Sequence, residues 1–261
     1  MNNMEDKSFI RSEKAVSEVL GFITVLGIML VAVSIIAVSG FPLIDDMKST
    51  AHKENIRQSF MVLDSSFDKV VFGKAPSQSV EMKLYDGIIS IRGNSYINIS
   101  SQVWNESNSS HEFQHFERQM RKADLEFMDL SIGYENTGVW EKYEDGNSLM
   151  VSAPSFIITE GSMMIPVAFI SGSESLSGQG HVRVISEKGN PSVHMHQNVS
   201  EVKITIMSDY YKAWGRYLED YLGMEVEEID DLNKTVCASL SGMKEMDVYI
   251  MYSPSKLSLE Q

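Results

Sequence analysis

The sequence is poor in several features that would identify common classes of protein. It has a single cysteine, Cys237, which excludes an internal disulfide framework and a zinc cluster built on cysteines. Its 22 Lys and Arg residues face 36 Asp and Glu residues, and a net charge of −14 argues against a nucleic-acid partner. The glycine motifs of nucleotide-binding proteins and of serine hydrolases do not occur. Hydrophobic residues make up 43% of the chain, which is enough for a folded core.

Charge is also missing from one long segment, because no charged residue occurs from Val19 to Ile44. A helix of that length spans about 39 Å, which exceeds the roughly 30 Å hydrocarbon core of a bilayer. The apolar run of a secretory signal peptide is shorter, about 7–15 residues, and is followed by small residues at the cleavage site. Gly40-Phe41-Pro42 is a poor site of that kind. The sequence therefore predicts a retained transmembrane helix.

The charges that flank this segment predict its orientation. Lys7, Arg11 and Lys14 precede it, and the acidic pair 45–46 follows it. Basic residues favour the cytoplasmic side of a membrane. We therefore expect a single-pass protein of the cell membrane, with a cytoplasmic N-terminus and an extracellular C-terminal part that carries nearly all of the negative charge.

The junction before the apolar run has the pattern of a processing site. A basic residue, a small residue and an apolar residue stand there as Lys14, Ala15 and Val16. This arrangement resembles the class III signal peptides of archaeal type IV pilin precursors. The resemblance implies that a prepilin peptidase cuts between Ala15 and Val16 and leaves the membrane helix on the mature protein. The stretches 73–84, 134–140 and 211–218 also look like segments of archaeal pilin-like membrane proteins, a family without an assigned biochemical activity.

The same resemblance gives a role to residues inside the helix. Glu18 stands where several archaeal pilins carry proline, and bacterial type IV pilins place a glutamate two residues later, which meets the N-terminal amine of a neighbouring subunit. Glu18 could act in this way, or it could lie at the headgroup level. Small residues such as Gly21 and Gly27 permit close approach of helices in lipid, so they are candidates for assembly with other pilin-like subunits or with copies of this chain.

The pattern after the membrane predicts a helical stalk and then a β-rich domain. We expect Phe41-Pro42 to bend or interrupt the helix. Helical spacing resumes after it, and Gly73 is a natural stop. The stretch 80–84 alternates, and Asp86-Gly87 predicts a hairpin to 88–91. The amphipathic stripe comprises Ile56, Phe60, Leu63, Phe67 and Val70, and the further strand candidates are 96–99, 148–151, 163–170, 181–186, 201–207, 235–240 and 248–252.

One further helix is expected after residue 208. Ser208-Asp209 can cap its start and Gly223 its end, and an aromatic stripe of Tyr210, Trp214, Tyr217 and Tyr221 is typical of a face that packs on a sheet. The fold class is thus α+β, with a long N-terminal helix and a mostly antiparallel β domain that carries one packed helix. We expect four segments: a leader (1–15), a transmembrane helix (16–44), a stalk helix (45–73) and an extracellular domain (74–261).

Sequons for N-glycosylation occur only after the membrane segment. Each has the form N-x-S/T, and an Asn-Ser-rich polar loop without sugar would give the same pattern. The candidate acceptors are Asn98, Asn105, Asn108, Asn198 and Asn233.

One motif suggests an enzyme. His111-Glu112-Phe113-Gln114-His115 matches the H-E-x-x-H signature of zinc proteases, in which a helix brings both histidines to one face. The residues from Phe113 to Leu130 have a helical stripe, although a loop followed by a strand fits the same spacing. Glu135 is the one downstream acid at a suitable distance for a third ligand. No G-x-x-H follows at metzincin spacing, and the preceding loop suits an exposed segment.

The sequence thus favours a pilin-like cell-surface subunit without a cofactor, a metal or an enzymatic activity. Its expected partners are the membrane, a prepilin peptidase and other pilin-like subunits or itself. The alternatives are an uncleaved, signal-anchored extracellular binding module and, third, a membrane-anchored zinc protease through His111, Glu112 and His115.

Overall fold

The computed structural model describes residues 5–105, 110–144 and 146–261, with side chains except at 5–15, 105 and 243–245. The chain forms two units, residues 1–52 and 53–261. One α-helix, α1 (Glu5–Val71), supplies nearly all of the first unit and the beginning of the second. The helix runs through Pro42, so of the two predicted outcomes the interruption is wrong, while the bend stays a prediction. Proline removes one backbone donor, but the turns on both sides of it keep their hydrogen bonds.

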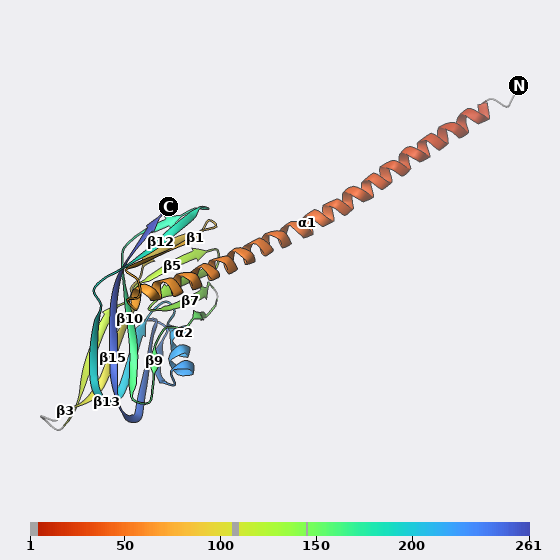
Figure 1. The fold of residues 1–261 in the computed structure, drawn as a ribbon. Coiled ribbons are helices and arrows are strands. Elements are labelled where there is room, and N and C mark those ends of the chain that lie inside the picture. Colours follow the sequence, from red (N-terminus) through yellow and green to blue (C-terminus); the bar gives the residue numbers. More distant parts are fainter. Residues whose placement is uncertain (1–4, 106–109, 145) are drawn as a thin grey trace. The chain divides into compact units, whose positions relative to one another are not determined.

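In the second unit, the last turns of α1 enter the core of the β domain. The predicted stripe is confirmed, because Ile56, Phe60, Leu63, Phe67 and Val70 are all buried. The helix ends at Val71, and Gly73 adopts a φ of 72°, which glycine reaches without the steric cost of a Cβ atom. The strands of this unit form two sheets, mostly antiparallel, as predicted (Figure 1).

The larger sheet has the order β1-β12-β15-β13-β3-β4, with β10 and β14 also paired to β15 and β9 paired to β10. Its one parallel pairing among the described strands joins β10 and β15. The long strands β13 and β15 run side by side in Figure 1. The strands are β1 (Ser77–Lys83), β3 (Tyr96–Asn105), β4 (Ser110–Gln119), β9 (Ile157–Ile158), β10 (Ser162–Ser171), β12 (His181–Lys188), β13 (Ser192–Met207), β14 (Glu225–Asp230) and β15 (Thr235–Glu260).

The smaller sheet has the order β11-β2-β5-β6-β7-β8. It packs against the buried stripe of α1 in one hydrophobic core, while the second core lies between the larger sheet and the short helix α2 (Tyr211–Arg216). The strands are β2 (Ile88–Arg92), β5 (Lys122–Phe127), β6 (Leu130–Glu135), β7 (Gly138–Tyr143), β8 (Ser148–Ser152) and β11 (Ser175–Ser177).

Most of the predicted strands are confirmed, but one predicted hairpin is absent and two predicted strands are parts of one. The turn at Asp86 exists, yet β1 pairs with β12 and β2 pairs with β5 and β11, so the predicted hairpin is wrong. The chain passes from one sheet to the other at this turn. The two strands predicted at 235–240 and 248–252 are parts of β15, because β13 pairs with both stretches across register shifts.

The helix predicted to begin after residue 208 is present but short. After α2, the chain continues in a π-helical turn (Tyr217–Tyr221), and Gly223 follows with a φ of 66°. Ser208 does not cap α2, because its hydroxyl accepts a hydrogen bond from the backbone of Tyr210, which is itself the N-cap residue. The aromatic stripe packs inward as predicted, except that Tyr221 is 65% exposed.

Candidate functional site

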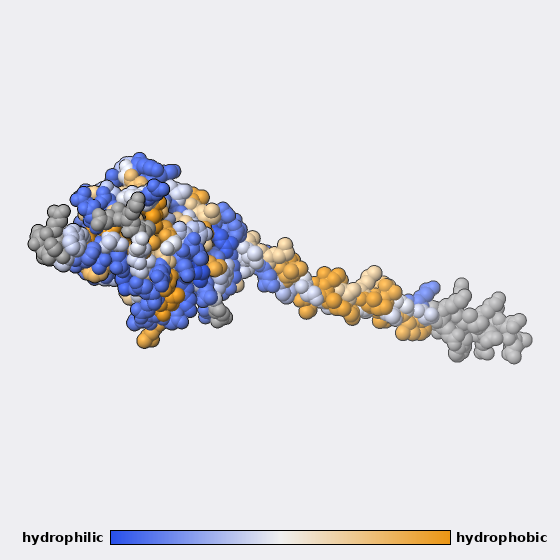
Figure 2. Space-filling model, turned by 90° about the horizontal axis from the view of Figure 1, so that it is seen from below, coloured by the Kyte–Doolittle hydropathy of each residue, from blue (hydrophilic) through white to orange (hydrophobic). Residues whose placement is uncertain are grey.

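The apolar segment of α1 is the first candidate functional surface. Its large apolar side chains from Val16 to Ile44 are 44–76% exposed, and by length and composition this is one helix that could cross a membrane. Figure 2 shows it as an orange stretch of the helix. A Cβ atom added at Gly21 or Gly27 would meet no atom within 4 Å, so both positions are open to a neighbouring helix.

The structure places the predicted processing residues on the same helix. The backbone of Lys14 and Ala15 is helical, and their side chains lie outside the described part of the chain. Val16 and Glu18 are exposed on α1.

The candidate glycosylation sites differ in accessibility. Asn98 is half-buried on β3, a strand with neighbours on both sides. Asn198 is exposed at a register shift of β13, with a φ of 53°. Asn233 is exposed in the turn before β15, where its amide donates to Asp230. The side chain of Asn105 and the whole of Asn108 lie outside the described residues.

The H-E-x-x-H motif lies on strand β4, so of the two structures that the sequence left open here, a helix or a loop with a strand, the chain forms the strand. In a strand, residues four apart are separated by roughly 13 Å, too far for His111 and His115 to share one ion. His111 contacts the ring of Trp104, and Nδ1 of His115 lies 2.8 Å from the hydroxyl of Ser100. The described residues contain no cluster of three or more His, Cys, Asp or Glu side chains placed to hold a metal.

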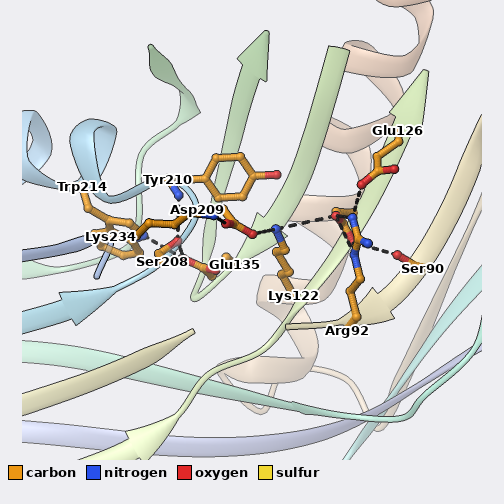
Figure 3. A network of polar contacts seen from close by, with 11 residues as sticks. Ser90, Arg92, Lys122, Glu126, Glu135, Ser208, Asp209, Tyr210, Trp214 and Lys234 are labelled. Carbon is orange, nitrogen blue, oxygen red and sulfur yellow. Dashed lines mark hydrogen bonds and ion pairs between the residues drawn. The ribbon is translucent and has the colours of Figure 1, made fainter. Parts of the chain in front are cut away.

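The structure instead brings together a polar network that sequence reasoning missed (Figure 3). At its centre is Lys122, the first residue of β5, which is buried. Its ammonium lies 2.8 Å from Asp209 and 3.6 Å from Asp124, and 4.8 Å from the ring centre of Tyr210. Burial alone would lower the pKa of Lys122, but Tyr210 and the two carboxylates raise it above its ordinary value.

The carboxylates of the network are arranged along β5 and at the start of α2. Asp124 is buried and accepts hydrogen bonds from Ser90 and Arg92 of β2, and Arg92 also contacts Glu126. Asp209 accepts from both Lys122 and Lys234, and these lysines hold its pKa well below the ordinary value despite partial burial. The network is therefore a chain of charges of alternating sign.

Glu135, at the end of β6, joins this network to the aromatic core. It is fully buried, and its Oε1 atom accepts hydrogen bonds from Ser208 at 2.7 Å and from the indole of Trp214 at 2.9 Å. Burial raises its pKa, against the charge of Lys122. Its position at a strand end was predicted. The zinc-protease alternative would have needed it as a third ligand, and its carboxylate instead binds Trp214 and Ser208.

The turn after Glu135 is strained and buried. Asn136 and Thr137 have φ angles of 49° and 61°, which are unusual for residues with a Cβ atom and more so for a β-branched threonine. The Asn136 amide oxygen accepts from the backbone of Ala168, and the Thr137 hydroxyl accepts from that of Ser155. These bonds from two other segments hold the turn in a conformation that is unfavourable by itself.

Two surface clefts open beside the network. The larger cleft, of about 440 Å³, is lined by residues of β5, β6 and β7. The smaller cleft, of about 370 Å³, is lined by Arg92, Ser95, Lys122, Asp209 and Lys234, among others. Arg92, Lys122 and Asp209 border both clefts, so the ion pair of Lys122 and Asp209 is common to the two. A polar cleft above buried charges is a typical place for a ligand.

A second group of polar side chains is buried on the inner face of α1, near the end of this helix. Asp64 accepts a hydrogen bond from Ser152, and Asp68 accepts one from Ser155. Burial raises the pKa of Asp64 to about 7 and that of Asp68 to about 6. One oxygen of each carboxylate is buried without a hydrogen-bond partner in the described part of the chain, and the charges of both act on the fully buried Tyr134. The helical spacing of Asp64 and Asp68 could have revealed this pair, since both flank the apolar stripe, one residue after Leu63 and Phe67.

Known proteins offer few comparisons. An uncharacterised protein of Archaeoglobus fulgidus is 35% identical over 78 residues, which is 30% of this chain and 26% of that protein. The chain thus spans about a quarter of the length of this relative. No solved structure matches. The family described as one of unknown function, DUF7289, matches residues 14–253, and the chain belongs to it.

Proposed function

We propose that this protein is an archaeal pilin-like cell-surface subunit, cut by a prepilin peptidase between Ala15 and Val16 and held in the membrane by α1. The observation that carries the proposal is the exposure of the large apolar side chains of this helix between Val16 and Ile44. Exposed apolar area of this extent is unfavourable in water but favourable in lipid. The part of α1 that follows is anchored in the domain by Phe60, Leu63 and Phe67.

The charges support an extracellular location of the β domain. Three basic residues precede the apolar segment, and acidic residues follow it. The exposed Asn198 and Asn233 are accessible to glycosylation on that side. The open positions at Gly21 and Gly27 supply a surface on which a second helix of the same kind could pack, with van der Waals contact as the main stabilising force.

Labelling of single cysteines in intact cells tests the topology. The native Cys237 is buried, and Leu232 is 90% exposed. We expect a membrane-impermeant maleimide to label Leu232→Cys in intact cells and to label Ser8→Cys only after lysis. Labelling of Ser8→Cys in intact cells, with protection of Leu232→Cys, would overturn the proposed orientation.

A signal-anchored binding module that is not processed remains the second candidate. The observation that favours it is the pair of clefts around Lys122 and Asp209, which are features of a ligand-binding domain. The two candidates differ in the N-terminus of the protein isolated from membranes, since only the pilin-like subunit begins at Val16.

A further inference from the structure

We propose that the smaller cleft, the one bordered by Arg92, Lys122 and Lys234, binds a phosphate group. Three of the side chains that line it are cationic, and Asp209 is the one acidic side chain on its described walls. Such a wall stands out on a chain whose net charge is −14. A cleft that collects basic residues on an acidic protein is a local site for an anion.

The three cations of this cleft have three carboxylate partners, but of these partners Asp209 alone lines the cleft. Lys122 and Lys234 both contact Asp209, at 2.8 Å and 2.5 Å, and Lys122 also lies 3.6 Å from a second carboxylate, that of the fully buried Asp124. Arg92 contacts Asp124 and Glu126, and neither of these two side chains lines the cleft. Each ammonium has three N–H donors, and Lys234 is half exposed, so it retains donors for a ligand.

A buried hydroxyl also borders the cleft. Ser95 lines the cleft, is buried and interacts with the carboxylate of Glu135. It adds a polar group to the cationic wall, since a hydroxyl both donates and accepts hydrogen bonds. Lysine, arginine and serine side chains together are typical ligands of a phosphate group, which accepts several charge-assisted hydrogen bonds.

Asp209 would compete with a bound phosphate for two lysines of the cleft. Its carboxylate lies where a phosphate oxygen would compete for the same two lysines. Removal of its charge in Asp209→Asn should therefore strengthen phosphate binding, whereas removal of a lysine should weaken it. Opposite effects of neighbouring substitutions are expected of a binding site and not of a general loss of structure.

Calorimetric titration of the full chain in a non-ionic detergent tests the proposal, with inorganic phosphate as the probe and the ionic strength held constant with sodium chloride. We expect saturable binding that is weakened about tenfold in Lys234→Ala and strengthened in Asp209→Asn. Lys203→Ala is the matched control, because Lys203 is also a partly exposed lysine with one carboxylate partner, Glu227, but it lies outside the cleft. We expect its effect to be less than twofold.

A second titration identifies the source of the phosphate group. Tighter binding of glycerol 3-phosphate than of inorganic phosphate assigns the cleft to a phosphate carried on a larger molecule, and equal or weaker binding assigns it to the free ion. Absence of saturable phosphate binding, or an equal loss of binding in Lys234→Ala and Lys203→Ala, overturns the proposal.

Discussion

The indole nitrogen of Trp214 donates a 2.9 Å hydrogen bond to the carboxylate of Glu135, and both side chains are fully buried. This contact joins α2 to the end of β6 and places the polar network against the aromatic core. Glu135→Ala would leave the donors of Trp214 and Ser208 unpaired inside the protein. We expect it to lower the free energy of unfolding by about 3 kcal/mol or more, since each orphaned buried group costs about 1–3 kcal/mol.

Glu135→Gln is the control for this prediction, because its amide oxygen can still accept from Trp214. Urea unfolding of the two variants should show a much smaller loss for Glu135→Gln. Equal midpoints for Glu135→Ala and the native chain would mean that the contact does not contribute to stability.

The carboxylates of Asp64 and Asp68, on the inner face of α1, predict that stability depends on pH. The pKa of Asp64 is raised to about 7 in the folded protein, above its ordinary value of 3.8. The folded state therefore holds this proton more tightly than the unfolded state. The stabilisation is complete below about pH 4 and is lost as the pH rises through 7.

Asp64→Asn removes this titration while it keeps a polar side chain of similar size beside Ser152. We expect the variant to gain stability relative to the native protein by about 2–4 kcal/mol between pH 4 and pH 8. Unfolding in urea at several pH values measures the difference, with the exposed Asp220→Asn as the control. A constant difference across this range would show that Asp64 titrates normally.

Phe60 tests the docking of the helix in the β domain. It is fully buried in the core beneath the smaller sheet, whereas the adjacent Val62 is 55% exposed. Phe60→Ala should cost about 3–5 kcal/mol because it leaves a cavity. Val62→Ala should change the stability by no more than about 0.5 kcal/mol. Similar thermal midpoints for the two variants would contradict the packing described here.

Gly27 tests assembly in the membrane. A leucine at this open position would hold neighbouring helices apart, so Gly27→Leu should reduce the yield of complexes recovered from membranes while the β domain stays folded. Val33→Leu is the control, since Val33 already carries a large exposed side chain on the same segment. An unchanged yield of complexes from Gly27→Leu would argue against assembly through this residue.

The elements predicted well from the sequence are those with strong local patterns. The stripe from Ile56 to Val70 and the alternation in β1 and β12 each encode burial of one face, so their type and core side could be predicted. The pairing of β1 with β12 could not, because contacts between distant segments leave no local signal. The choice between helix and strand near His111 stayed open for a related reason, since the apolar spacing of β4, β5 and β6 also fits a helical period.

The polar network could not be predicted either, because it also depends on contacts between distant segments. Lys122, Asp124 and Asp209 are ordinary charged residues in the sequence, and only the pairing of β2 with β5 and the position of α2 bring them together. A sequence signal existed at Glu135, because a charged residue followed by Asn-Thr-Gly at a strand end is a turn signal. Nothing local indicated that this turn would be buried.

The most direct test of the account is the N-terminus of the protein extracted from its native membranes, determined by peptide mass mapping. We expect a mature chain that begins at Val16 and retains the apolar part of α1. A chain that begins near Met1 would contradict processing by a prepilin peptidase and would favour the anchored binding module.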